Sequence, residues 1–429
     1  MKRKSILCVT LAAALAAGSL VGCGAPASES SSTASADTTS APASSESSAA
    51  IQPCEVTFWH AMTGQQETTL TELTDQFNAE NEYGIQVTLV NQGSYNDLST
   101  KLTANAAADT LPDLSQAYNS WLIPYLDKVV HLDDFVANDY DNYEDIMEGY
   151  REETSQFGFI NAMPFNKSTY VYFYNKTMFD ELGLEAPETW EDLLNIGKTF
   201  QEEKGMVSLG FDDMAGMLEA TLRQNGCEYV NEEGAQFDNE AGQQALDFIM
   251  EMYNSGYARL VGEDNYFSGP FSNQLIPAYV GSSTGVSYIT HEGWELGVAP
   301  LPGNTEKAAN TAGTNIVMFS KDENQQKAAW EYLKFLTSTD ATVKWAMDTG
   351  YLPVRTSAYE SETYQEFMAG DATATASYAQ TGAFFSSPAF NGSYDIQNAV
   401  NAKLEELILN QADSTTALQE LVDAVNGAL

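Results

Sequence analysis

Apolar residues after position 54 follow two alternating patterns. Short apolar runs over residues 56–59, 85–90, 170–174 and 315–319 are typical of β-strands. Between them lie longer segments in which apolar residues recur every three or four positions, as on one face of a helix. The helical faces hold Leu70, Leu73 and Phe77, then Ala245, Phe248, Ile249 and Met252, and then Ala329, Tyr332, Leu333 and Leu336. Strands that alternate with helices predict an α/β class with largely parallel sheets.

One helix start can be read directly from the sequence. Thr189 follows Pro187 and precedes Asp192 by three positions, which predicts an N-cap residue and a capping box. The chain after residue 54, about 375 residues, is longer than one hydrophobic core supports, so we expect two lobes.

The first two dozen residues have the features of a secretory signal. A basic start over residues 1–4 precedes an apolar stretch over residues 5–21, which is too short and too close to a small-residue cleavage site for a membrane span. The stretch ends in Leu20-Val21-Gly22-Cys23, which resembles the lipobox of bacterial lipoproteins. The resemblance implies that residues 1–22 are a signal peptide and that Cys23 carries a lipid. An incidental cysteine at an ordinary cleavage site is the alternative.

Composition and charge narrow the choice of partners. Residues 24–50 are almost entirely Ser, Thr and Ala, so residues 23–50 are expected to form a lipidated tether rather than part of a core. The formal net charge is −41, from 60 acidic and 19 basic residues. This charge excludes nucleic acid as the main partner and disfavours adsorption to an anionic membrane surface. A hydrophobic content of 43% predicts a packed interior.

Cysteine and histidine give no sign of a metal site or cofactor. Cys54 and Cys227 are far apart in sequence, and two isolated thiols are favoured over a disulfide between them. The histidines, which are His60, His131 and His291, have no zinc-ligand spacing from one another or from a cysteine. We therefore expect neither a metal nor a cofactor.

Six sequence blocks, taken in order, resemble the extracellular solute-binding proteins of bacterial ABC importers. The blocks are Thr57-Phe58-Trp59-His60-Ala61-Met62, Gln76-Phe77-Asn78-Ala79-Glu80-Asn81, Pro164-Phe165-Asn166-Lys167-Ser168, Tyr174-Asn175-Lys176, Glu188-Thr189-Trp190-Glu191-Asp192-Leu193 and Thr349-Gly350-Tyr351-Leu352-Pro353. The resemblance is to the carbohydrate type, which includes maltose-binding and glycerol-3-phosphate-binding proteins. It covers essentially the whole chain after residue 51.

The resemblance implies a two-lobe fold like that of type II periplasmic binding proteins, in which the ligand lies in a cleft and the lobes close over it by a hinge. One lobe would comprise residues 51–162 and 311–348, and the other residues 163–310 and 349–429. The chain would cross between the lobes near Pro164, Thr311 and Gly350. Two C-terminal helices would pack on the second lobe, through Leu404, Leu407 and Ile408 and then Leu418, Leu421 and Val425.

The same resemblance implies a set of ligand contacts made by hydroxyl, aromatic and glycine residues. They are Tyr95, Ser168, Ser282, Gly313 and Tyr351. Two positions depart from the phosphate-binding pattern: Asn119 stands in place of a carboxylate, and residues 390–393 lack the late arginine. Arginine is the natural bidentate partner of a phosphate. A neutral sugar or short oligosaccharide is therefore favoured, and glycerol-3-phosphate or a glycerophosphodiester is the alternative.

Four tryptophans could stack on sugar rings, and ordinary packing is the alternative for each: Trp59, Trp121, Trp190 and Trp294. Trp59 ends the first strand, where open α/β sheets bind ligands, and Trp190 begins a capped helix. These two join Asn119 as candidate site residues. Lys167 and Arg355 lie next to the crossings and are expected to be exposed charges rather than anion contacts.

An exported enzyme is the rival interpretation. Residues 281–285 match the Gly-x-Ser-x-Gly pattern of hydrolases, but no acid lies between Ser283 and the only later histidine, His291. A glycoside hydrolase stays an alternative, because 60 acids guarantee chance carboxylate pairs. A purely structural lipoprotein is a third class. We predict a monomeric, lipid-anchored binding protein on the extracellular face of the membrane, with no catalytic residues, that passes its ligand to ABC permease subunits.

Overall fold

Two β-sheets organise residues 50–429, the part of the chain that the computed structural model describes. The predicted signal peptide over residues 1–22, the lipid on Cys23 and the tether up to residue 49 lie outside the described residues. Residues 50–429 belong to one compact unit.

The first sheet has the strand order β2-β1-β3-β13-β4. Its strands are β1 (Glu55–His60), β2 (Gln86–Asn91), β3 (Leu114–Ala117), β4 (Met163–Pro164) and β13 (Asn315–Met318). β1 runs parallel to β2 and β3, and β13 returns antiparallel beside β3. The predicted strands over residues 56–59, 85–90 and 315–319 are thus confirmed, with ends that differ by one residue or so.

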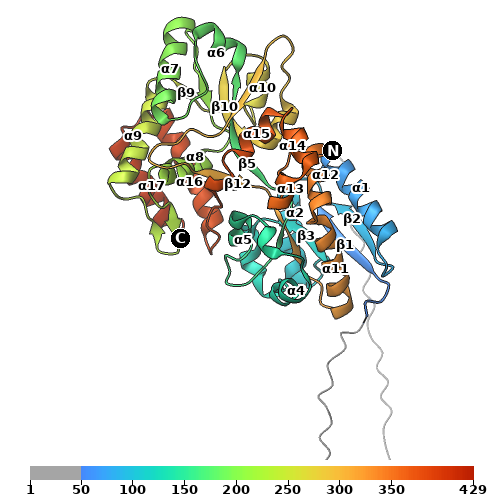
Figure 1. Ribbon diagram of the computed structural model, residues 1–429. Helices are drawn as coiled ribbons and strands as arrows, with labels where there is room; N and C mark the ends of the chain where they lie inside the picture. The colour runs from blue at the N-terminus through green and yellow to red at the C-terminus, as the bar shows by residue number, and fades with distance from the viewer. Residues whose placement is uncertain (1–49) are drawn as a thin grey trace, which may run out of the picture. The chain divides into compact units, whose positions relative to one another are not determined.

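Helices pack around this first sheet (Figure 1). They are α1 (Gly64–Glu80), α2 (Tyr95–Ala108), α3 (Asn119–Leu122), α4 (Asp133–Asp139), α5 (Glu148–Glu153), α11 (Glu323–Leu336), α12 (Thr339–Thr349), α13 (Thr356–Glu360) and α14 (Glu362–Met368). Leu70, Leu73 and Phe77 of α1 meet Tyr332, Leu333 and Leu336 of α11 in one core with strand residues of β1 and β2. The apolar faces predicted for both helices are therefore the faces that are buried.

The second sheet is built on β5 (Ser168–Asn175). Its other strands are β10 (Ala278–Ser282), β11 (Leu296–Ala299), β12 (Ala309–Ala312) and β14 (Phe384–Phe385). β10 takes one edge of β5, and β11 and β12 share the other edge, all three antiparallel to it. The expectation of largely parallel sheets is wrong for this sheet, because an apolar run marks a strand without recording its direction.

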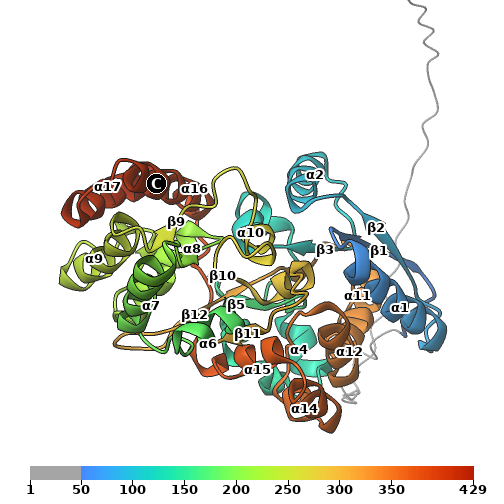
Figure 2. The same ribbon diagram turned by 90° about the horizontal axis from the view of Figure 1, so that it is seen from above.

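The second sheet has its own helices and a larger core. The helices are α6 (Lys176–Leu182), α7 (Trp190–Lys204), α8 (Met214–Gln224), α9 (Glu240–Asn254), α10 (Ser268–Ser272), α15 (Ala372–Tyr378), α16 (Ser393–Leu409) and α17 (Ser414–Gly427). Figure 2 shows α16 and α17 beside α8 and α9, and their apolar residues enter the same core. Two-residue strands pair at its margin: β6 (Leu209–Gly210) with β9 (Ala258–Arg259), and β7 (Val230–Asn231) with β8 (Gly234–Ala235).

The capping box predicted for α7 is confirmed. The hydroxyl of Thr189 accepts a hydrogen bond from the backbone N–H of Asp192, whose carboxylate accepts one from the N–H of Thr189. The pair satisfies two backbone donors that would otherwise have no partner in the first turn. It fixes where α7 begins and hence where Trp190 lies.

The chain passes between the sheets from β4 to β5 and again from β12 to β13. After residue 349, α13 and α14 still contact α12, whereas α15 contacts β5 and β11. The limits expected for the lobes, 51–162 with 311–348 and 163–310 with 349–429, stay a prediction. Among residues 50–429, no helix is long and apolar enough to cross a membrane.

Candidate functional site

A cavity of about 350 Å³ lies between elements of the two sheets. On the side of the first sheet its lining comes from α2, α3 and α5. On the side of the second sheet it comes from β5, α8, β7, β12 and the segment that leads into α16. The residues that line it are Tyr95, Asn96, Tyr118, Asn119, Ser120, Trp121, Glu153, Tyr170, Asp213, Ala215, Gly216, Glu219, Tyr229, Val230, Asn310, Thr311, Ala312, Gly313, Ser386, Ser387, Pro388, Ala389, Ser393, Tyr394 and Gln397.

An aromatic cluster forms the wall on the side of the first sheet. Tyr118 and Trp121 meet edge to face with ring centroids 4.9 Å apart, and Tyr95 lies 5.7 Å from Tyr118. The capping box of Ser94 and Asp97 fixes the start of α2 and so places Tyr95. The hydroxyl of Tyr95 accepts a hydrogen bond of 3.0 Å from Asn166. Rings held in this way can cover the apolar faces of a ligand.

The charged groups of the lining are carboxylates: Glu153, Asp213 and Glu219. Glu219 is bridged to Arg223 at 3.2 Å and accepts the hydroxyl of Ser387. Burial raises the pKa of Glu219, while Arg223 acts to lower it. No lysine or arginine is among the described residues that line the cavity.

Asp213 is the carboxylate of the lining without an ion-pair partner in the described residues. It is the N-cap residue of α8, where its Oδ1 accepts the backbone N–H of Gly216 at 3.1 Å. Its Oδ2 accepts the hydroxyl of Tyr170 at 2.8 Å. Two donors therefore fix the orientation of a partly exposed carboxylate, which keeps lone pairs free for the hydroxyls of a ligand.

Glu153 in the cavity wall is paired with a buried lysine, Lys167. Lys167 is fully buried, and its Nζ lies 2.7 Å from Oε1 of Glu153 and 3.4 Å from the carbonyl oxygen of Gly313. Asn315 donates a further bond of 2.9 Å to the same carboxylate oxygen. Burial lowers the pKa of Lys167, and the charge of Glu153 acts in the opposite direction. The pair lies between the two crossings that join the sheets.

The expectation that Lys167 and Arg355 are exposed charges is wrong. Arg355 is 7% exposed, its Nη1 lies 3.1 Å from Asp145, and its Nε donates to the carbonyl of Thr337. The partners of both cations lie far away in sequence, so local composition gave no sign of them. A long cation is buried when such a partner compensates its lost hydration.

Three of the eight ligand residues expected from the sequence line the cavity: Tyr95, Asn119 and Gly313. Asn119 is buried, donates to the carbonyl of Glu153 and accepts from Asn161. Gly313 has φ +96°, and a Cβ there would lie 1.9 Å from a backbone oxygen, so only glycine is compatible with this position.

Four of the expected residues lie outside the lining of the large cavity and outside that of a smaller cavity beside it. Tyr351 is buried, stacks on Trp345 with centroids 5.6 Å apart, and has its pKa raised by burial. Ser168 is buried at the start of β5, and Ser282 is hydrogen-bonded to Thr284 at 2.9 Å. Trp59 is half-buried beside the core that contains Leu98. Contact of these residues with a ligand stays a prediction.

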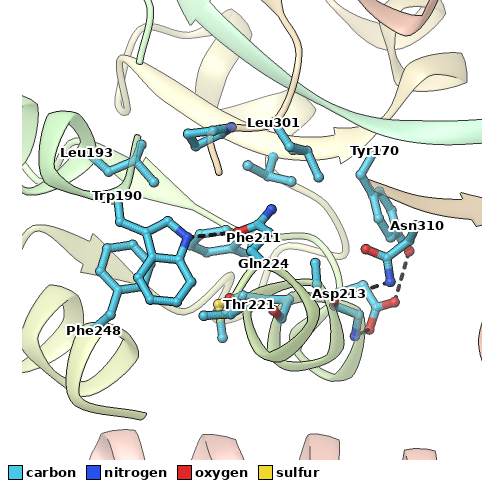
Figure 3. A pocket seen from close by; sticks show the side chains of 15 residues that line it. Tyr170, Trp190, Leu193, Phe211, Asp213, Thr221, Gln224, Phe248, Leu301 and Asn310 are labelled. Carbon is cyan, nitrogen blue, oxygen red and sulfur yellow. Dashed lines mark hydrogen bonds between the residues drawn. The ribbon is translucent and has the colours of Figure 1, made fainter. Parts of the chain in front are cut away.

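Trp190, the remaining expected residue, lines a second cavity of about 40 Å³ (Figure 3). Its ring stacks on Phe248 with centroids 4.5 Å apart, and its Nε1 donates to Gln224 at 2.8 Å. Apolar side chains make up most of the remaining wall: Leu193, Phe211, Met217, Ala220, Val280, Leu301 and Pro302. The small cavity shares Tyr170, Asp213, Gly216 and Asn310 with the large one.

Sequence reasoning missed several polar residues of the large cavity, notably Tyr170, Asp213 and Asn310. The one local signal was Asp213, an acid placed to cap the helix that follows. Of the other two tryptophans considered, Trp121 lines the large cavity, whereas Trp294 is buried against Phe271.

The hydrolase pattern at residues 281–285 does not form a nucleophile site. Ser283 is fully buried and its hydroxyl has no hydrogen-bond partner. A serine in this state can neither meet a substrate nor lose its proton to a base.

Cys54 and Cys227 are free thiols, so the alternative of a disulfide between them is excluded. Within residues 50–429, no cluster of three potential metal ligands occurs.

Solved structures show which known fold the chain shares. The structure of cyclic alpha-maltosyl-1,6-maltose binding protein from Arthrobacter globiformis matches with a TM-score of 0.78 at 24% identity, over 88% of this chain and 99% of that chain. UgpB from Mycobacterium tuberculosis, solved in complex with glycerophosphocholine, matches with a TM-score of 0.76 at 20% identity, over 87% of this chain and 98% of that chain. At these identities the likeness shows the fold alone, and it is the predicted one.

Curated relatives and a family model agree with the fold. The sn-glycerol-3-phosphate-binding periplasmic protein UgpB of Yersinia enterocolitica is 24% identical over 346 residues, which are 74% of this chain and 78% of the relative. UgpB of Escherichia coli K12 is 25% identical over 342 residues, 73% of this chain and 77% of the relative. The model that describes bacterial extracellular solute-binding proteins matches residues 72–375. The chain therefore belongs to the bacterial extracellular solute-binding protein family, whose members bind substrates for ABC transporters and are not enzymes.

Proposed function

We propose that the protein captures a neutral sugar or short oligosaccharide in the 350 Å³ cavity and delivers it to the permease of an ABC importer. The choice of ligand rests on the chemistry of the lining, which combines aromatic rings with carboxylates and amides. The described residues of this lining include no lysine or arginine. The volume of the cavity lies within the range of roughly 300–1,000 Å³ that is usual for small-molecule sites.

Each kind of lining group has a counterpart in a sugar. Tyr118 and Trp121 offer faces and edges for stacking against the C–H groups of a pyranose ring. Asp213 offers acceptor positions for two hydroxyls. A phosphate would meet three carboxylates and no guanidinium, so its desolvation would not be compensated.

Glycerol-3-phosphate or a glycerophosphodiester is the second candidate, because two curated relatives carry the name of a glycerol-3-phosphate-binding protein. Arg223 does not line the cavity: it bridges Glu219, which does, and lies 4.4 Å from the ring centroid of Phe385. The absence of a free cation in the described lining disfavours this candidate.

The rest of the proposal concerns the position of the protein in the cell. Cys23 would carry the lipid, residues 24–50 would tether the globular part, and the protein would act as a monomer on the extracellular face of the membrane. Residues 163–310 with the C-terminal helices would close on the other lobe once the ligand is bound, since only the closed arrangement lets both sides contact it. From their contacts, α13 and α14 would move with the first sheet.

A thermal-shift screen tests the proposed ligand class. Glucose, maltose, cellobiose, glycerol-3-phosphate and glycerophosphocholine would each be added to the purified protein, because a ligand that binds only the folded state raises the melting temperature. A neutral saccharide should raise it and should be recovered chemically unchanged. A response restricted to the phosphorylated compounds would contradict the proposal, and conversion of the saccharide to product would restore the enzyme interpretation.

A further inference from the structure

The small cavity beside the large one is apolar and close to a buried polar atom that has no partner. Asn310 is 4% exposed and lines both cavities. Its Nδ2 donates to the carbonyl of Gly216 at 3.3 Å, which fixes the orientation of the amide and leaves Oδ1 as the free acceptor. No hydrogen-bond partner of Oδ1 exists in the described residues. A buried acceptor of this kind is costly unless a ligand supplies a donor.

Resting on the function proposed above, we propose that the small cavity receives the methyl group of an acetamido substituent, so that the ligand is an N-acetylated sugar. The sugar ring would lie in the large cavity, and its acetamido N–H would donate to Oδ1 of Asn310. The methyl group would then enter the space beside Trp190 and Phe248 (Figure 3).

The acetamido group supplies both features that the site requires. A hydroxyl substituent has a donor but nothing apolar to fill the small cavity, and a methoxy group has a methyl but no donor. A secondary amide has an N–H donor two bonds from a methyl group. Its carbonyl needs a donor in turn, and the hydroxyl of Tyr229 in the wall of the large cavity is buried and unpartnered.

Size also selects a small acyl group. One water molecule needs roughly 10–15 Å³ of such a cavity volume, so about 40 Å³ accommodates roughly three or four heavy atoms. Trp190 is held in the wall by its stacking on Phe248 and its hydrogen bond to Gln224. The methyl group of an acetyl substituent fits this space, whereas the alkyl chain of an octanoyl group is too long for it.

The direct test compares matched sugar pairs by calorimetric titration of the purified protein. The pairs are N-acetylglucosamine with glucose, N-acetylgalactosamine with galactose, and N,N′-diacetylchitobiose with cellobiose. In at least one pair the acetylated member should bind roughly 20-fold more tightly, from one buried methyl and one added hydrogen bond. N-octanoylglucosamine should bind at least tenfold more weakly than N-acetylglucosamine. This second comparison needs no variant.

Two variants separate the cavity from the amide contact. Ala220→Leu fills the small cavity from α8. In the responding pair, the ratio of the affinity for the acetylated sugar to that for the unsubstituted sugar should fall close to one, while the unsubstituted sugar keeps its affinity. Asn310→Leu removes the acceptor at similar volume and should lower the same ratio about five- to tenfold. Ala107→Leu, on the exposed face of α2, introduces the same side chain outside both cavities and should leave the ratio unchanged.

The outcomes distinguish this proposal from the function on which it rests. If unsubstituted sugars bind as tightly as their acetylated partners, or Ala220→Leu leaves the ratio unchanged, the acetamido proposal is overturned and sugar capture stands. If neither member of any pair binds and only phosphorylated compounds do, both proposals fail.

Discussion

Replacing Lys167 with methionine tests the buried ion pair between Lys167 and Glu153, which lies between the two crossings. The substitution keeps an unbranched chain of similar length but leaves the carboxylate of Glu153 buried without its cation. The Nζ–Oε1 separation is 2.7 Å, Lys167 is fully buried and the Glu153 side chain is only 11% exposed, so the substitution removes the cation that compensates a largely desolvated carboxylate. Breaking a buried pair from one side costs about 3–5 kcal/mol.

The expected loss converts into a measurable shift of the melting temperature. With an unfolding entropy of about 2.1 cal/mol/K per residue, residues 50–429 have a total of roughly 0.8 kcal/mol/K. The loss then corresponds to a fall of about 4–6 °C. Differential scanning calorimetry of the ligand-free protein at pH 7 is the assay, because bound ligand would add its own stabilisation.

The double variant Glu153→Gln/Lys167→Met distinguishes loss of the pair from loss of packing. A neutral glutamine can still accept from Asn315, and its N–H₂ can donate to Oδ1 of Asn315, which has no partner in the described residues. The double variant should therefore recover most of the loss.

An exposed lysine gives the matched control. Lys176 lies 2.6 Å from Asp180 on the surface of α6, and Lys176→Met should leave the melting temperature essentially unchanged. A stabilising role of the Lys167–Glu153 pair is contradicted if Lys167→Met behaves like Lys176→Met, or if the double variant is no more stable than the single one.

Three further predictions concern pH, backbone and ligand contacts. Burial raises the pKa of Asp212 to about 6, so the folded state binds the proton of this carboxyl more tightly than the unfolded chain does. The free energy of unfolding should therefore fall as pH rises from about 4 to 6. In urea-unfolding experiments across this pH range, Asp212→Asn should flatten the dependence. Gly313→Ala should lower stability by about 1–3 kcal/mol or more, because the residue has φ +96° and the added Cβ would lie 1.9 Å from a backbone oxygen, whereas Gly269→Ala, with open space around it, should change stability little in thermal melts. Tyr170→Phe removes the donor to Asp213 and should weaken saccharide binding about tenfold in calorimetric titrations, with the melting temperature of the ligand-free protein nearly unchanged; an unchanged affinity would contradict a role for this carboxylate in binding.

Local patterns predicted the elements of this fold well. Apolar periodicity gave the buried faces of α1 and α11, and the spacing of Thr189 and Asp192 gave the start of α7. Each of these signals involves residues that are close together in the sequence, so it can be recognised without knowledge of the fold. The order and direction of strands around β5 depend on pairings between distant segments, and the apolar runs carry no information about them.

The candidate site was predicted less completely for the same physical reason. Tyr95, Asn119 and Gly313, which were expected as ligand contacts, line the cavity, and their contact with a ligand stays a prediction. Asn310 becomes informative only when the fold buries its amide and leaves one oxygen without a partner. Lys167 likewise reads as a surface charge until the fold brings Glu153 to it. Burial and pairing of polar groups are properties of the assembled structure.

Calorimetric titration of the purified protein with the neutral saccharide that gives the largest thermal shift, alongside glycerol-3-phosphate, tests the central claim most directly. We expect saturable binding of the saccharide at one site, recovery of the saccharide unchanged, and no heat of binding with glycerol-3-phosphate. Tight binding of glycerol-3-phosphate with no response to any saccharide would contradict the account.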